Sequence, residues 1–171
     1  DEASGEYNRA YIRKYFPEGG VVLMRCVQRS QGLMVAPGNP LGVKGIADLP
    51  RIRYVNRQKG SGTRVLLDYL LKQHRIESSD ILDYDREEMT HTAVAAAVAA
   101  GSADAGMGIL SAARVYALGF IPVCMEEYDL LISEAALSME SVQRLIRIMQ
   151  SDDFAARLEK LGGYQLDRPG E

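Results

Sequence analysis

Two hydroxyl side chains and two glycines stand together in one short segment of the chain, Gly60-Ser-Gly-Thr63. Three cationic side chains flank this segment: Arg57, Lys59 and Arg64. Hydroxyl groups donate hydrogen bonds to the oxygens of an anion, and glycines allow a bound group to approach the backbone closely. We therefore predict that Ser61, Gly62 and Thr63 bind a small oxyanion, with Arg57 as a supporting cation.

This segment requires a strand before it and a helix after it. Ile52–Asn56 predicts a short strand, and Val65–Lys72 predicts a helix that ends near His74. The first N–H groups of a helix have no internal partner and carry the positive end of the helix dipole, so they favour a bound anion. An ordinary helix cap is the alternative interpretation. The segment is not a P-loop, because Lys59 precedes the glycines instead of following them.

One helix start cannot enclose an anion, so a second wall is required. Thr90 and His91 precede the alanine-rich segment Thr92–Ala100, which predicts a buried helix that ends at Gly101. These two residues offer a second helix start. In the alternative interpretation Thr90 is only a cap and His91 faces solvent. Each charge-assisted hydrogen bond contributes about 1.5–3 kcal/mol, so micromolar affinity, about −8 kcal/mol, needs most of the anion enclosed.

The composition excludes several other classes of function. Among 171 residues, 47% are hydrophobic and 25% are charged, which is typical of a globular domain with a core. The net charge of −3 disfavours direct nucleic-acid binding. No apolar run approaches the roughly 20 residues of a membrane span, so we expect no membrane insertion. Cys26 and Cys124 lie in apolar runs, which predicts free thiols and a reducing, cytoplasmic location.

The sequence predicts neither a metal site nor a catalytic centre. Two histidines and two cysteines at wide spacing give no zinc signature, and we expect no cofactor. No Gly-x-Ser-x-Gly elbow is present, and no carboxylate pair supports His74 or His91 as a general base. Tyr84–Glu88 predicts a solvated loop, although a loop between a strand and a helix can line a cleft.

Strands and helices alternate along the chain, which predicts an α/β fold with a mostly parallel sheet. We expect Ser111, Ser138 and Ser151 to cap helices and Gly162-Gly163 to end the last one. Pro37-Gly-Asn-Pro40 marks a boundary between two lobes. The predicted helices are 6–16, 111–118, 139–149 and 152–161. The predicted strands are 21–27, 33–36, 103–109, 120–124 and 128–132, and a turn at 28–32 separates the first two strands.

Taken together, these segments resemble the periplasmic-binding-protein-like (type II) domain of molybdenum and tungsten metabolism. That domain is fused to molybdopterin molybdotransferases or to helix-turn-helix regulators. Ser61 and Thr63 also match the Arg-x-x-x-Ser-Gly-Thr loop of tungstate-binding transport proteins, which begins here at Arg57. The matching stretches cover nearly the whole chain: Gly5–Asn8, Gln31–Pro40, Tyr54–Asp68, Tyr84–Glu88, Thr90–Val98 and Ala103–Ile109.

The resemblance implies a two-lobed, hinged domain that binds and senses molybdate or tungstate. Lobe one would comprise residues 1–36 and 126–171, and lobe two residues 37–125 with the anion-binding turn. Such domains begin with a strand–helix–strand–helix portion that precedes the first residue here, so we expect lobe one to be incomplete. The partner would be a fused or separate molybdenum-cofactor enzyme or DNA-binding domain.

Two other functions remain open at this point. The same turn could be the phosphate cup of an enzyme, such as a molybdopterin molybdotransferase, which would need a catalytic base near Ser61. The region could also be a structural or oligomerising fragment. The sequence does not distinguish molybdate from tungstate, because the two anions have nearly the same size and charge.

Overall fold

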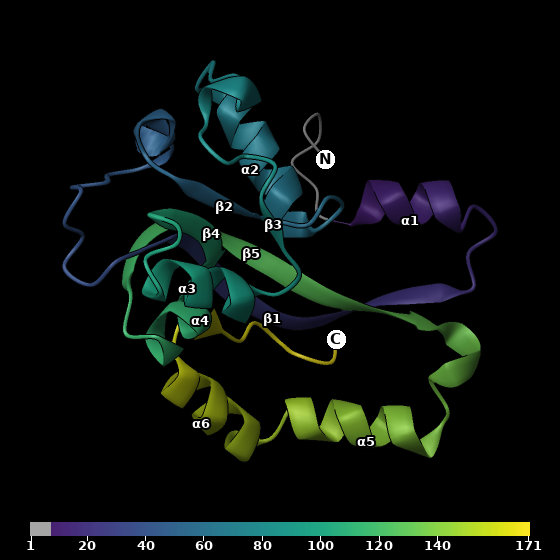
Figure 1. Ribbon diagram of the computed structural model, residues 1–171. Helices are drawn as coiled ribbons and strands as arrows, with labels where there is room; N and C mark the ends of the chain where they lie inside the picture. Colours follow the sequence, from purple (N-terminus) through teal and green to yellow (C-terminus); the bar gives the residue numbers. More distant parts are fainter. Residues whose placement is uncertain (1–7) are drawn as a thin grey trace. The chain divides into compact units, whose positions relative to one another are not determined.

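The structure is a computed structural model, and it describes residues 8–171 (Figure 1). The chain divides into two compact units. Unit 1 comprises Asp1–Arg29 and Glu126–Glu171, and unit 2 comprises Ser30–Met125. The second crossing lies between Met125 and Glu126, and the assignment of these units to lobes stays a prediction. The first crossing lies at Arg29–Ser30, not after Ala36, and both crossings fall inside continuous strands, Val21–Val35 and Gly119–Ser133.

Unit 2 is an open sheet covered by helices, and it carries the segment predicted to bind an anion. Its strands follow the order β3-β2-β4-β1-β5. Strand β2 is parallel to both β3 and β4, whereas β1 is antiparallel to β4. The predicted α/β class is confirmed. The elements are η1 (Ile46–Arg51), β2 (Tyr54–Arg57), α2 (Gly62–Gln73), η2 (Ser78–Asp80), β3 (Glu87–Glu88), α3 (His91–Ala99), β4 (Ala105–Ile109), α4 (Leu110–Val115) and parts of β1 (Val21–Val35) and β5 (Gly119–Ser133).

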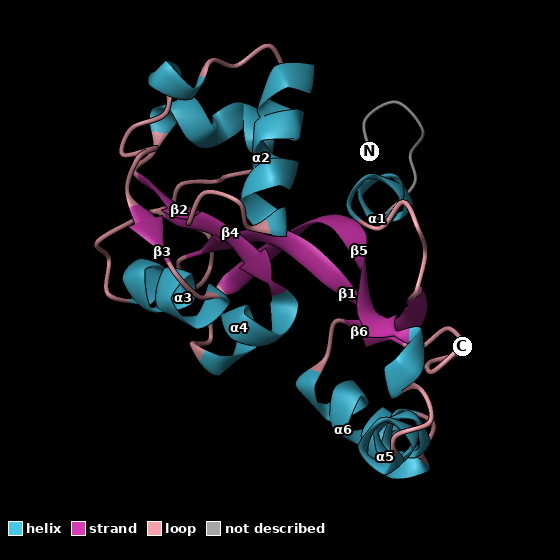
Figure 2. Ribbon diagram, turned by 90° about the vertical axis from the view of Figure 1, so that its right-hand side faces the viewer, coloured by secondary structure: helices cyan, strands magenta, loops and turns pink. Residues whose placement is uncertain are grey.

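The two faces of this sheet carry different helices, as Figure 2 shows. On one face, α2 contributes Leu67 and Leu71 to a core with Leu33, Tyr54 and Met107. On the other face, α3 and α4 form a second core, whose members include Met34, Val55, Val94, Val98 and Ala113. The chain therefore leaves β2 on one face and leaves β4 on the opposite face. In open α/β sheets, ligands bind beside the carboxyl ends of strands at such a reversal.

Two predicted breaks in the strands are wrong. Instead of two strands separated by a turn at residues 28–32, β1 is continuous from Val21 to Val35. Likewise, β5 runs unbroken from Gly119 to Ser133. In β1, Gln28 pairs with Gln165 of β6 (Tyr164–Gln165), and Gly32 pairs with Gly108 of β4. Backbone pairing on partner strands thus outweighs the polar, turn-like composition of this segment.

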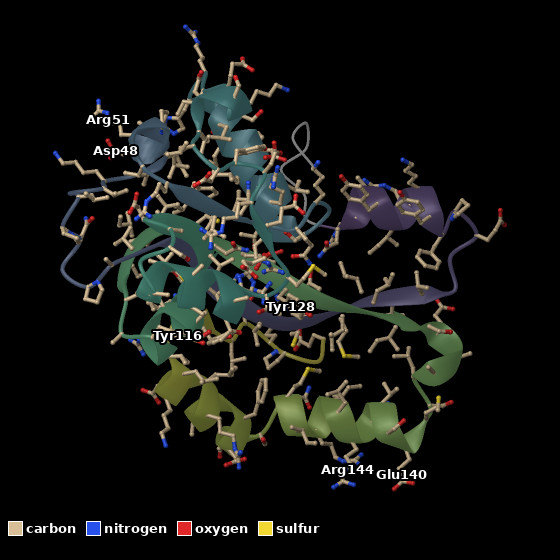
Figure 3. The ribbon with its side chains drawn as sticks, in the orientation of Figure 1. Asp48, Arg51, Tyr116, Tyr128, Glu140 and Arg144 are labelled. Carbon is tan, nitrogen blue, oxygen red and sulfur yellow. The ribbon has the colours of Figure 1, made fainter. Side chains whose placement is uncertain are left out.

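Unit 1 contains the remaining elements, and ion pairs stabilise it. The Arg29 guanidinium pairs with Glu126 and lies 4.5 Å from the ring centroid of Tyr128, which Figure 3 marks on β5. Glu140 and Arg144 lie one turn apart on α5 in the same view. The elements are α1 (Arg9–Tyr15), parts of β1 and β5, η3 (Glu134–Ala136), α5 (Glu140–Met149), α6 (Asp152–Leu161) and β6. The predicted helix at 6–16 corresponds to α1, with residues 6 and 7 outside the described part.

The predicted helix caps were correct at one serine and wrong at two. Ser151 accepts a hydrogen bond from the N–H of Phe154 and caps α6, as predicted. In contrast, α4 begins directly after Ile109, and α5 begins after Met139, with no side-chain cap at either position. No helix within residues 8–171 is long and apolar enough to cross a membrane.

Glycine in β4 lets α3 approach the sheet closely on its face. A Cβ on Gly106 would lie 2.4 Å from Val94 Cγ1 and 2.9 Å from the carbonyl oxygen of Val55. The first of these atoms belongs to α3 and the second to the backbone of β2, so neither can withdraw easily. The position therefore requires glycine for packing.

We predict that Gly106→Ala lowers the free energy of unfolding by about 1–3 kcal/mol, because the added methyl overpacks the interface between α3 and β2. Chemical denaturation followed by circular dichroism measures this loss. Gly45→Ala is the matched control, since a Cβ there would meet no atom within 4 Å. Equal stability of the two variants would contradict this account of the packing.

Candidate functional site

The start of α2 has the geometry that the sequence predicts. Ser61 is the N-cap, and its hydroxyl oxygen accepts a hydrogen bond from the N–H of Arg64 at 3.2 Å. Gly60 precedes it with φ of 86°, a left-handed conformation that glycine adopts without strain. Capping occupies a lone pair of the Ser61 oxygen and leaves its O–H free to donate to a ligand. Gly62 is exposed, and Thr63 is buried.

The start of α3 follows the carboxyl end of β3, which is parallel to β2. Thr90 is the N-cap of α3 and accepts a hydrogen bond from the N–H of Ala93 at 3.0 Å. His91 is partly buried, and a Cβ on Gly108 would lie 3.4 Å from its Nδ1 atom. The ring thus lies beside β4, which excludes the fully solvent-facing alternative.

The structure brings all the predicted residues to one edge of the sheet, which we call the carboxyl edge. Arg57 is the last residue of β2, and in the parallel strand register it lies opposite Glu88, the last residue of β3. The two helix starts follow these strand ends. Because α2 and α3 cover opposite faces, the structure places Ser61 and Thr63 on one face and Thr90 and His91 on the other. Their shared role as ligand residues stays a prediction.

Arg57 connects the two loops of this edge. Its Nε donates to the side-chain oxygen of Gln58 at 3.1 Å. One terminal nitrogen donates to the carbonyl oxygen of Met89 at 3.1 Å, directly before Thr90. These bonds give Arg57 a structural role at the carboxyl edge, and its support of an anion stays a prediction.

The buried cation of the site is Arg64, whose role the sequence did not reveal. Its side chain is only 4% exposed. It forms ion pairs at 3.3 Å with both Asp68 and Glu87, and it donates to the carbonyl oxygen of Arg57, also at 3.3 Å. Its guanidinium carbon lies 4.1 Å from the ring centroid of Tyr84. The i,i+4 spacing of Arg64 and Asp68 was the only sequence signal of this network.

The loop that was predicted to be solvated is anchored to α2 by this network. The hydroxyl of Tyr84 donates to the carboxylate of Asp68. Burial, followed by the bond to Asp68, raises the pKa of the Tyr84 hydroxyl, so this group stays protonated and keeps donating. The N–H of Gln58 also donates to the carbonyl oxygen of Glu88 at 3.2 Å. The segment between Tyr84 and Glu88 therefore has a fixed position against the start of α2.

Buried polar side chains are concentrated at this edge. Within residues 8–171 they are Gln31, Asn56, Thr63 and Arg64. The side-chain nitrogen of Asn56 donates to the carbonyl oxygen of Tyr84 at 3.2 Å, and its oxygen accepts from the N–H of Arg57 at 3.1 Å. Interiors rarely bury polar groups without a structural or functional reason. The carboxyl edge of unit 2 is therefore the strongest candidate site.

A separate cavity of about 810 Å³ lies within unit 1, where the sequence predicted no site. Charges of both signs line it, and Arg25 is already paired there with Asp167. Burial raises the pKa of the Cys26 thiol in its wall. Cys26 and Cys124 are both half-buried. In the described part of the chain, no group of three or more His, Cys, Asp or Glu side chains could hold a metal ion.

Comparison with known proteins connects this geometry to a family. The chain is 35% identical to YvgK of Bacillus subtilis (strain 168) over 173 aligned residues, which cover 100% of the chain and 56% of YvgK. The chain thus spans little more than half the length of this relative.

Two solved structures share the fold. The substrate-binding domain assigned to a molybdenum ABC transporter of Clostridium difficile aligns with a TM-score of 0.63 at 15% identity, covering 93% of this chain and 74% of that one. A substrate-binding protein assigned to phosphate ABC transport in Clostridium perfringens, solved with bound phosphate, aligns with a TM-score of 0.64 at 12% identity, covering 88% and 74%. A family model described as "PBP superfamily domain" matches residues 1–150. The chain therefore belongs to the PBP superfamily of periplasmic-binding-protein-like domains.

Proposed function

We propose that the chain binds a small tetrahedral oxyanion at the carboxyl edge of unit 2, against the start of α2. The observation that supports this most directly is the helix start itself, where Ser61, Gly62 and Thr63 stand beside a buried polar network. The Ser61 hydroxyl can donate a hydrogen bond, and the first N–H groups of a helix have no carbonyl partner within the helix. Each bond to an anion contributes about 1.5–3 kcal/mol, and the helix dipole adds about 0.3–2 kcal/mol.

Arg64 makes this helix start compatible with a negative charge. Asp68 and Glu87 approach the first two turns of α2, and unpaired carboxylates there would repel an anion. The guanidinium of Arg64 pairs with both and neutralises part of their charge. The positive end of the helix thus remains available for a ligand.

We propose molybdate or tungstate as the ligand, in a sensing or delivery module for a molybdenum-cofactor enzyme or a DNA-binding domain in the cytoplasm. The motif from Arg57 to Thr63 and the fold shared with a domain assigned to molybdenum transport support this choice. The fold shared with a phosphate-bound protein makes phosphate the first competitor to test.

Binding is favoured over catalysis by the contacts of the turn. A catalytic phosphate cup needs a base within about 2.6–3.2 Å of the reacting hydroxyl. The Ser61 oxygen accepts from the backbone N–H of Arg64, and His74 lies at the opposite end of α2. His91 is the first residue of α3, which covers the face of the sheet opposite to α2.

We predict that the double substitution Ser61→Ala/Thr63→Ala weakens oxyanion binding by about 10-fold to 1,000-fold, because two hydroxyl donors are lost. Isothermal titration calorimetry with molybdate, tungstate, phosphate and sulfate measures the change on the full chain.

The matched control is Ser151→Ala, which removes the equivalent cap from α6 in unit 1. It should lower stability by about 0.5–2 kcal/mol and leave binding unchanged. Heat from none of the four anions with the unsubstituted protein would rule out the proposed function. Normal binding by the double variant would move the site away from the start of α2.

We also predict that Arg64→Met weakens binding by about tenfold or more, because unpaired Asp68 and Glu87 then repel the anion and release the loop around Tyr84. Arg64→Lys, which retains the charge, should recover part of the affinity. Calorimetry gives both values.

Arg157→Met is the control, since Arg157 forms an exposed ion pair with Asp153 at the same i,i+4 spacing. Its effect on stability should stay within about 0.5 kcal/mol, as for other exposed pairs. Unchanged affinity in Arg64→Met would show that the site does not depend on the buried network.

A further inference from the structure

One buried polar side chain at the carboxyl edge has no hydrogen-bond partner. Gln31 in β1 is 0% exposed. Neither its Nε2 nor its Oε1 atom forms a hydrogen bond with any described residue. A glutamine amide carries two donors and an acceptor, and buried groups of this kind are nearly always satisfied. An amide with both functions unpaired therefore requires an explanation.

The position of Gln31 in the sheet places it at the same edge as the proposed site. Alternate residues of a strand share a face, so Gln31 lies on the same face as Leu33 and Val35. That face is the one covered by α2, because these two residues share a core with Leu67 of that helix. Along the strand, Gln31 lies opposite Ile109, the last residue of β4. Gln31 therefore lies at the carboxyl edge, on the face where α2 begins.

Two other buried side chains of this edge, Asn56 and Arg64, have partners, which distinguishes Gln31 from them. Asn56 uses both its nitrogen and its oxygen in hydrogen bonds to backbone atoms. Arg64 contacts two carboxylates and a carbonyl oxygen. Asn56 and Arg64 are thus paired, whereas the amide of Gln31 is not.

We propose that Gln31 is a ligand-binding residue whose amide completes the oxyanion site. Its Nε2 would donate to an oxygen of the anion held at the start of α2. Its Oε1 would accept from a hydroxyl, either an O–H of a protonated anion or the hydroxyl of a capping side chain. This inference rests on the proposed function and adds a contact from β1 to those from α2.

The burial of Gln31 sets a condition for binding. Because neither amide atom is open to solvent, neighbouring groups must move before an anion reaches it. Gln31 is the second residue of unit 2, directly after the crossing at Arg29–Ser30.

The test is Gln31→Met, which keeps the length of the side chain and removes both polar functions. A structural residue and a ligand residue respond differently to this change. A ligand-binding amide, unpaired in the free protein, should be dispensable for stability but required for affinity. We expect a melting temperature without ligand that is unchanged or higher, and affinity that falls by about tenfold or more for the tightest-binding anion among molybdate, tungstate, phosphate and sulfate. Thermal unfolding and calorimetry on the full chain supply the two readouts.

Gln73→Met is the matched control, because it makes the same chemical change at the exposed far end of α2. Affinity of Gln31→Met within about twofold of the unsubstituted protein would overturn the role of Gln31 while leaving the oxyanion function intact. A lower melting temperature together with lost binding would also overturn it, since the amide would then be structural. Absence of binding to all four anions by the unsubstituted protein would overturn the proposed function, and the role of Gln31 with it.

Discussion

The buried charge of Arg64 is the constraint on which the rest of the site depends. A guanidinium removed from water is costly unless charged and polar groups surround it. Its partners come from three places: Asp68 one turn later in α2, Glu87 in β3 and the carbonyl oxygen of Arg57 at the end of β2. These segments cannot separate without exposing or isolating that charge. The turn before α2 and the loop before α3 are thus held as one body.

The sheet topology explains why this body lies at an edge where a ligand can bind. Strand β2 is parallel to both of its neighbours, so the carboxyl ends of β2, β3 and β4 share one edge. The chain leaves β2 toward the face of α2 and reaches β4 through α3 on the other face. This divergence keeps helix backbone from covering the strand ends. Gly106 allows α3 to lie close to the sheet on its face.

Much of this arrangement could be predicted from sequence, because the signals were local. The cap at Ser61, the cap at Thr90 and the strand before Arg57 each depend on a few neighbouring residues. The continuity of β1 could not be predicted, since its polar middle is held by strands far away in the chain. The burial of Arg64 was equally hidden, because one of its two carboxylate partners is Glu87, distant in sequence. Residues distant in sequence therefore determine both the continuity of β1 and the burial of Arg64.

The polar residues of the carboxyl edge differ in whether folding supplies them with hydrogen-bond partners. Asn56 and Arg64 are satisfied by backbone and carboxylate groups that folding itself brings together. Folding supplies no partner for the amide of Gln31, although a hydrophobic residue of similar size would fit a buried strand position without this cost. A group that weakens the free protein is best explained by a state in which it is paired. Among the states open to a PBP-like domain, the ligand-bound one provides such a partner.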